Sequence, residues 1–339
     1  MRPKNATAKD VAARAGVSRS LVSMYLSRNP NVWISEVTRA RLDAAIRELG
    51  YRPNRSAQIL RGGKSRVIGV VLGGISGLFA SCLSEALMEN LEEAGYRVFL
   101  GITRYDPERE RRVLESMMNF EIDALVYTLE PDYVSDLLLR CSARIPVFLT
   151  ERKEAYPFHS VQFDLSEALG KTMKFLSDRK VEKVALMTNR IGFAETLFLK
   201  AGENSRMKLR VFRAESTSGD DRKFLKELSR FRPDAVIVLA GVRADAAWKL
   251  LGPETIWIDS WSLPFQRTES GSRIRPAGSI VRPFRPYAEA LSGALLETLQ
   301  NPGDTVLHRS IPALFLKRKE RKVFRETLLN DPYFQAFEH

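Results

Sequence analysis

Residues 19–26, RSLVSMYL, carry side chains that suit contact with nucleic acid. An arginine such as Arg19 can make a bidentate pair with O6 and N7 of guanine, and Ser20 and Ser23 can donate or accept a hydrogen bond at several bases. Met24 can touch a thymine methyl group. We expect these four residues to contact base edges in the DNA major groove. The alternative for Arg19 is a phosphate contact, because phosphate contacts outnumber base contacts.

Six polar residues are expected to contact the sugar-phosphate backbone, which polar and cationic side chains bind without discriminating between sequences. They are Thr7, Lys9, Ser18, Asn29, Arg39 and Asn54. Ser18 and Ser23 have a second interpretation, because a serine hydroxyl at the start of a helix also accepts hydrogen bonds from the first backbone N–H groups.

The charge of the chain is concentrated at the same end. Residues 1–66 contain 14 Lys and Arg against 4 Asp and Glu, whereas residues 67–339 contain 39 against 37. The N-terminal segment therefore holds +10 of the total formal charge of +12. Such a cluster beside helical periodicity is the electrostatic footprint of a nucleic-acid-binding module, and double-stranded DNA is the expected partner.

Three short helices are expected to position these side chains, over residues 8–15, 19–26 and 35–49. Thr7 and Asp10 have the spacing of a capping box, Gly16 ends the first helix, and Ser18 can cap the second. Two helices joined by a three-residue turn have helix-turn-helix spacing. The third helix should close the core with an apolar stripe made of Val37, Leu42, Ala45, Ile46 and Leu49.

Residues 53–66, PNRSAQILRGGKSR, are predicted to form a hinge. The proline blocks a continuing helix, Asn54 can cap one more short helix, and a pair of glycines ends it. A helix of about eight residues is marginal on its own. Leu60 in this segment has two interpretations: a contact with DNA, or packing on the domain that follows.

From Val67 onward, strand-like apolar segments alternate with segments of helical periodicity. The strand-like segments are VIGVVL, YRVFLGI, DALVYT and IPVFLT, then KVALM, LRVF, DAVIVL and TIWID. This alternation predicts two doubly wound lobes with parallel sheets. The last segments, SIVR near Ser279 and a helix over 287–299, follow a proline-rich crossover and are expected to return to complete the first lobe.

The predicted fold is therefore α plus α/β. A three-helix headpiece occupies residues 1–52, a hinge 53–66, a two-lobed α/β domain 67–322, to which the resemblance described next assigns effector binding and dimerisation, and an extension whose role the sequence leaves open 323–339. A chain of 339 residues is long enough for a small module and two α/β lobes.

These patterns resemble a known family. The segment TAKDVAARAGVSRSLVS, followed by ELGYRPNRSAQILRGGKSRVIGVVL, is similar to the lactose repressor family of bacterial transcription regulators, most strongly over residues 7–72. The resemblance implies a homodimer or a dimer of dimers that binds a pseudo-palindromic operator, with a core like a two-lobed periplasmic binding protein. It also implies that Ala57 and Leu60 enter the minor groove, where two leucines wedge into a flexible base step and kink the DNA.

The resemblance further implies a small, sugar-like effector in the cleft between the lobes. The matching positions are Ser76, Phe79, Glu151, Asp164, Asp259 and Trp261. Asp259 in WIDSW is the strongest single candidate, and Trp261 can stack on a ring. The alternative roles are helix capping or a surface salt bridge for the carboxylates, and packing between lobes for Trp261.

Several polar positions that the family uses in the cleft are replaced in this chain. The segment GGISGLF lacks the usual asparagine, and Gly241 and Val242 stand at a common Asn-Asp pair. A usual arginine is either replaced by Leu199, ahead of Gly202, or deleted. A second hypothesis therefore stays open: a DNA-binding repressor, effector-independent or regulated by a protein, with a vestigial cleft.

An enzyme is not expected. Histidine occurs only at positions 159, 308 and 339, and the sequence has no GxSxG elbow, phosphate loop or HExxH motif. Cys82 and Cys141 lie far apart in apolar stretches, which suits core residues of a cytosolic protein better than a disulfide or a metal site. No stretch approaches the ~18 apolar residues of a membrane span. We expect a soluble cytoplasmic protein without catalytic residues, metal or cofactor.

Overall fold

The computed structural model describes twelve stretches of the chain, namely residues 6–26, 32–51, 64–75, 78–129, 136–150, 158–188, 193–203, 205–213, 222–239, 244–260, 276–303 and 305–320. The chain divides into two compact units, Met1–Ser65 and Arg66–His339.

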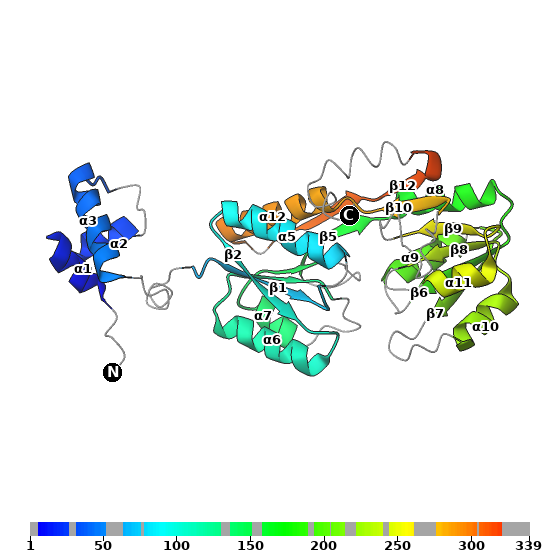
Figure 1. Ribbon diagram of the computed structural model, residues 1–339, viewed down its shortest axis with the longest axis horizontal. Coiled ribbons are helices and arrows are strands. Elements are labelled where there is room, and N and C mark those ends of the chain that lie inside the picture. The colour runs from blue at the N-terminus through cyan, green and yellow to red at the C-terminus, as the bar shows by residue number, and fades with distance from the viewer. Residues whose placement is uncertain are drawn as a thin grey trace. The chain divides into compact units, whose positions relative to one another are not determined.

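The first unit consists of the helices α1 (Ala8–Ala15), α2 (Arg19–Leu26) and α3 (Glu36–Leu49) (Figure 1). The Thr7 hydroxyl accepts from the backbone N–H of Asp10, and the Asp10 carboxylate accepts from the backbone N–H of Thr7, so the predicted capping box is present. Gly16 and Gly50 end α1 and α3 with φ of +66° and +58°, a left-handed conformation that residues with a Cβ atom rarely adopt. All three predicted helices are confirmed.

The core of this unit is small and lies between the three helices. Its fully buried members are Val11, Ala12, Ala15, Val22, Leu42 and Ala45. Ile46 and Leu49 pack against them as predicted, but Val37 is 70% exposed, so its place in the apolar stripe was wrong. Val37 precedes Leu42 by five residues, and at about 100° per residue this turns its side chain roughly 140° away from the buried face.

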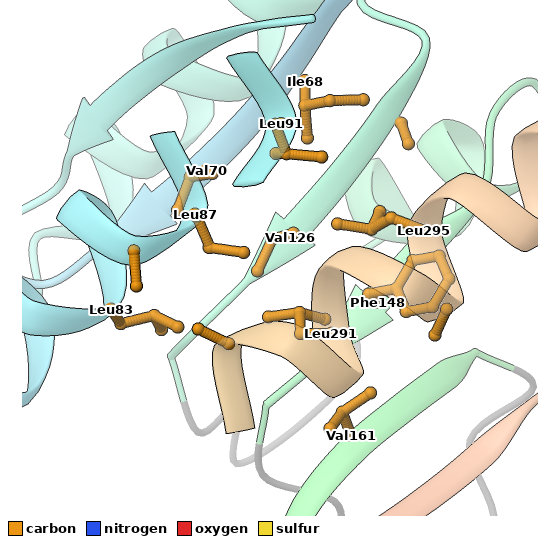
Figure 2. Packing of buried hydrophobic residues seen from close by; sticks show 14 of the residues in the cluster. Ile68, Val70, Leu83, Leu87, Leu91, Val126, Phe148, Val161, Leu291 and Leu295 are labelled. Carbon is orange, nitrogen blue, oxygen red and sulfur yellow. The ribbon is translucent and has the colours of Figure 1, made fainter. Parts of the chain in front are cut away.

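The second unit begins with a six-stranded sheet of order β11-β5-β4-β3-β1-β2, in which every pair is parallel. Its strands are β1 (Val67–Leu72), β2 (Arg97–Ile102), β3 (Ala124–Tyr127), β4 (Val147–Leu149), β5 (His159–Asp164) and β11 (His308–Pro312). One face is covered by α5 (Leu78–Glu93) and α12 (Phe284–Gln300), the other by α6 (Pro107–Asn119) and α7 (Asp136–Ser142) (Figure 1). Figure 2 shows Leu291 and Leu295 of α12 beside Val126 and Phe148, so a late helix completes this core.

The second sheet has the order β12-β10-β9-β8-β6-β7 and is parallel except for β12, which runs antiparallel to β10. Its strands are β6 (Lys183–Thr188), β7 (Lys208–Arg213), β8 (Ala235–Val238), β9 (Ile256–Asp259), β10 (Gly278–Val281) and β12 (Leu314–Lys317). Helices α8 (Ser166–Ser177) and α9 (Phe193–Glu203) pack on one face, α10 (Arg222–Phe231) and α11 (Ala244–Leu251) on the other, and a short 3-10 helix, η1 (Arg318–Glu320), follows β12. The predicted pair of doubly wound lobes is confirmed.

The chain crosses between the sheets after β5, after β10 and after β11. The expected return to the first lobe is correct for α12 and wrong for SIVR, because Ser279 lies on β10 of the second sheet. The strands β5, β11 and β12 were not predicted. In β11 exposed and half-buried residues alternate, so it lacks the continuous apolar run that marks an inner parallel strand.

Cys82 and Cys141 are buried in the first lobe, as predicted, and they are not joined by a disulfide. Among the described residues, no helix is both long enough and apolar enough to cross a membrane.

Candidate DNA-contacting surface and effector site

The start of α2 presents polar side chains to solvent. Arg19, Ser20 and Ser23 are exposed and Met24 is half-buried, whereas Val22 has no exposed surface and anchors the helix in the core. The Ser18 hydroxyl accepts from the Leu21 backbone N–H at 3.1 Å, which caps α2 as the sequence suggested. The four predicted base-contacting residues therefore lie on one short, capped helix, and their role in contacting bases stays a prediction.

Two side-chain contacts between the helices were not predicted from the sequence. The Tyr25 hydroxyl of α2 donates to the Asp43 carboxylate of α3 at 2.7 Å. Arg14 of α1 pairs with Glu48 of α3 at 2.7 Å, with both side chains about half exposed. Polar residues far apart in the sequence give no periodic signal, so these contacts could not be found from spacing.

The predicted backbone contacts fall into two groups. Lys9, Ser18 and Arg39 are exposed, and Arg39 also donates through Nε to the carbonyl of Ile34 at 3.1 Å. The hydroxyl of Thr7, also exposed, is engaged in the α1 cap. The remaining DNA-contacting candidates lie outside the described residues: Asn29, Asn54, Ala57 and Leu60.

The effector candidates are only partly described. Ser76, Glu151 and Trp261 lie outside the described residues, and Phe79 lies in α5 with its side chain outside the described part. The remaining two are at the carboxyl ends of strands in the two sheets: Asp164 ends β5 of the first sheet and Asp259 ends β9 of the second. Ligands of parallel α/β sheets bind at this end of the strands.

Asp164 serves as a cap in the structure. Its Oδ1 accepts from the backbone N–H of Ser166 at the start of α8, at 2.9 Å. This hydrogen bond and one from the Ser166 hydroxyl hold the pKa of the Asp164 carboxyl below its ordinary value, because both stabilise the charged form. An ionised, exposed carboxylate here can still accept from a ligand, so its effector role stays a prediction.

Further buried polar groups lie at the same edge of the second sheet and were not predicted. Ser260 follows β9 and has no exposed surface, Arg282 follows β10 and is 3% exposed, and Glu195 of α9 is buried and pairs with Arg213 at the end of β7. Within the described part of the chain, the Ser260 hydroxyl and Glu195 Oε2 have no hydrogen-bond partner. Only the tertiary structure brings these residues to one edge.

The described residues also line two cavities at the opposite ends of the sheets. One of about 260 Å³ includes Val147 and His159, which start β4 and β5. The other, of about 530 Å³, includes Ile256, which starts β9, and Trp257. Neither cavity involves the predicted effector residues.

His159 and His308 join two strands of the first sheet. His159 Nδ1 accepts from the Leu307 backbone N–H at 3.1 Å, and its ring stacks on Phe148 at 4.6 Å. His308 Nδ1 lies 2.9 Å from the Ser160 hydroxyl. These contacts give both histidines a place in the packing of β5 against β11.

The chain is similar to known bacterial regulators. Residues 7–54 match the family model "Bacterial regulatory proteins, lacI family". Over 171 residues the chain is 38% identical to the HTH-type transcriptional regulator GntR of Escherichia coli (strain K12), an alignment that spans only 50% of that regulator and 50% of this chain. It is 25% identical over 329 residues to catabolite control protein A of Staphylococcus epidermidis (strain ATCC 12228 / FDA PCI 1200), covering 89% of this chain and 97% of that protein.

Solved structures share the whole fold. The lac repressor dimer bound to operator and the anti-inducer ONPF matches with a TM-score of 0.74 and 22% identity, over 93% of this chain and 98% of that one. The Cra regulator of Pseudomonas putida in complex with fructose 1-phosphate matches with a TM-score of 0.61 and 16% identity, over 75% and 98%. Residues 7–54 thus carry the helix-turn-helix of the lacI family of bacterial regulatory proteins, the chain is similar to transcription regulators of this kind, and the solved structures share its fold.

Proposed function

We propose that the protein is a sequence-specific repressor that binds a pseudo-palindromic DNA operator as a homodimer in the cytoplasm. The observation that carries this proposal is the exposure of Arg19, Ser20 and Ser23 on α2, a helix anchored by Val22 and by the hydrogen bond from Tyr25. In a helix-turn-helix, the first residues of the second helix enter the major groove while the preceding helix lies across the backbone.

Dimerisation follows from the size of the headpiece. A single small module buries too little surface for tight specific binding, and two-fold symmetric regulators bind two half-sites about one helical turn apart. In this proposal the hinges of two protomers pair on the operator, with Ala57 and Leu60 in the minor groove. Thr7, Lys9, Ser18, Asn29, Arg39 and Asn54 contact the DNA backbone.

A small effector between the lobes then modulates the affinity for DNA. Supporting this are buried side-chain oxygens at the carboxyl edges of both sheets, Thr150 Oγ1 after β4 and Ser260 Oγ after β9, which have no hydrogen-bond partner among the described residues. Buried polar groups are nearly always hydrogen-bonded, and the hydroxyl groups of a ligand are suitable partners for these two. The proposed contacts of the effector site are Asp259, Asp164, Ser76, Phe79, Glu151 and Trp261.

The test is genome-wide footprinting of the bound sites, followed by binding of the full chain to a recovered site and to each half-site. We expect a pseudo-palindrome and much weaker binding to one half-site. Full affinity for a single half-site would rule out the dimeric operator complex. The effector is tested by measuring the affinity for the same site in the presence of metabolites handled by the products of the neighbouring genes. An affinity that none of these metabolites changes would favour the effector-independent repressor.

A further inference from the structure

The cavity of about 530 Å³ lies at the amino edge of the second sheet. Ile256 starts β9 and Ala277 directly precedes β10, and both line the cavity. Lys317 ends β12, but this strand runs antiparallel to β10 and Lys317 pairs with Gly278, so it lies at the same edge. Asp259 is at the other end of β9. The cavity is therefore separate from the proposed effector site.

Aromatic residues form part of the cavity wall. Trp248 of α11 and Trp257 of β9 both line it, with ring centroids 5.1 Å apart and planes tilted by 56°. Phe175, in the last turn of α8, lines it as well. Small-molecule sites usually measure about 300 to 1,000 Å³ and are lined mainly by apolar and aromatic side chains with a few polar groups. The size and the lining of this cavity thus suit a ligand with an aromatic ring.

Trp257 also carries a hydrogen-bond donor for which the described residues supply no acceptor. The residue is 2% exposed, and its Nε1 has no hydrogen-bond partner in the described part of the chain. Buried polar groups are nearly always hydrogen-bonded. An oxygen atom of a ligand is a suitable acceptor for this N–H group.

Cationic side chains line the same cavity. Arg179, Lys317 and Arg318 are exposed, and none of them forms an ion pair with a carboxylate of the described residues. Arg179 donates through Nη1 to the carbonyl of Phe175 at 3.0 Å, and its guanidinium lies 3.6 Å from the centroid of the Phe175 ring. Because a guanidinium has five N–H donors, most donors of Arg179 remain available to a ligand.

The charge balance of the cavity favours an anionic ligand. Its described lining also contains Glu254 and Glu320, so the three cations leave a formal charge of +3 − 2 = +1. Glu320 accepts through Oε2 from the backbone N–H of Lys317 at 2.8 Å, which engages one of its oxygens. The ring of Phe175, which would attract a cationic ligand, already has the guanidinium of Arg179 over it.

We propose that this cavity binds a small aromatic anion, with its ring beside Trp248 and Trp257 and its anionic group on Arg179 and Lys317. Aromatic rings stack favourably on tryptophan in offset or edge-to-face arrangements. The planar fork of N–H donors in arginine matches two oxygens of a carboxylate or a phosphate, and lysine adds a point charge. The proposal goes beyond the proposed function, because it assigns a second ligand site at the edge of the sheet opposite to Asp259.

The test measures binding of small probes to the full chain by isothermal titration calorimetry at constant ionic strength. The probes 3-phenylpropionate and AMP combine an aromatic ring with a carboxylate or a phosphate. The partial analogues 3-phenylpropanamide and adenosine keep the ring without the charge, whereas acetate and inorganic phosphate keep the charge without the ring. We expect at least one aromatic anion to bind about tenfold more tightly than both of its partial analogues. Binding of 3-phenylpropionate alone identifies a carboxylate site, and binding of AMP alone a phosphate site.

Substitution of the cations then locates the site. Arg179→Gln and Lys317→Gln should each weaken the affinity for the aromatic anion by about tenfold, because each removes a charged hydrogen-bond donor. Both side chains are exposed, so both variants should fold. Arg230→Gln is the matched control: Arg230 is an exposed arginine of α10 in the same lobe, and no residue of this helix is in the described lining of the cavity.

Arg230→Gln should leave binding of the aromatic anion unchanged. It changes the net charge as much as the two test variants do and keeps the same headpiece, so an anion bound at the headpiece cancels in the comparison. Three results would overturn the proposal: no binding of either aromatic anion, equally tight binding of a partial analogue, or normal binding by both the Arg179 and the Lys317 variant.

Discussion

The hydroxyl of Tyr25 on α2 lies 2.7 Å from a carboxylate oxygen of Asp43 on α3. Val22 is the fully buried side chain of α2, and Tyr25 and Leu26 pack partly buried against the same core, so this polar contact adds to the apolar packing that orients the short helix. The exposed side chains of Arg19, Ser20 and Ser23 turn with the helix. The Tyr25–Asp43 contact therefore connects the packing of the headpiece to the direction of its candidate DNA-contacting residues.

Tyr25→Phe removes this hydrogen bond and keeps the ring. We expect the headpiece to lose about 1 kcal/mol of stability, seen as faster amide hydrogen exchange in α2, and operator affinity to fall more than affinity for random DNA. Tyr105→Phe, in the second unit, is the control and should leave exchange in α2 unchanged. Equal losses for operator and random DNA would show that the contact does not orient α2.

Arg19→Ala should relax specificity at one base pair of each half-site, by about 1 to 3 kcal/mol, if Arg19 pairs with a guanine. The measurement is binding to the operator and to a set of single base-pair variants. Lys9→Ala is the matched control, because loss of an exposed phosphate contact weakens all sequences alike. A uniform loss for Arg19→Ala would instead assign this residue to a phosphate.

Operator affinity should fall steeply with salt. Each phosphate neutralised by Lys or Arg releases condensed counterions, so several contacts per headpiece lower the affinity by orders of magnitude between low and physiological salt. The slope of the logarithm of the affinity against the logarithm of the salt concentration should be shallower by about one unit per headpiece in Lys9→Ala. A nearly flat response would place the DNA contact away from the basic segment 1–66.

Leu60→Ala should abolish the kink in the operator and most of the preference for operator over random DNA. The unstacking of a base step costs a few kcal/mol, which the inserted side chains offset, while the charge of the headpiece keeps non-specific binding. Circular permutation assays measure the kink, and light scattering should show unchanged dimers. If kinking and selectivity both survive, Leu60 packs on the following domain.

Thermal stability should decrease below neutral pH, and His159 should contribute to the loss. Burial, and with it the nearby His308, lowers the pKa of His159 below its ordinary value of 6.5, so the folded state favours the neutral ring. The unfolded chain then binds the proton at higher pH than the folded one, so the contribution is full above pH 6.5 and is lost as the pH falls from that value through the lower pKa of the folded state. His159→Asn should show a smaller drop between neutral and mildly acidic pH. An identical drop would assign the effect to other groups.

The sequence by itself determined the headpiece and the alternation of strands and helices. These features depend on interactions over a few residues, so the sequence shows them directly. Examples are the cap formed by Thr7 and Asp10, the left-handed Gly16 and the apolar run VIGVVL. The apolar run TIWID also located Asp259 at the end of a strand, whereas β5, which ends at Asp164, was not predicted. Local signals failed at Val37, where an apolar residue lies one step off the stripe, and at β11, an edge strand without a continuous apolar run.

Only the tertiary structure decided which segments share a sheet and which polar residues share an edge. SIVR stays in the second sheet because β10 pairs with β9 and β12, while the next helix, α12, buries Leu291 and Leu295 in the first lobe. Such pairings join residues far apart in the chain, and no spacing rule encodes them. The same reason applies to the hydrogen bond between Tyr25 and Asp43 and to the burial of Ser260 and Arg282. Only the tertiary structure shows these features.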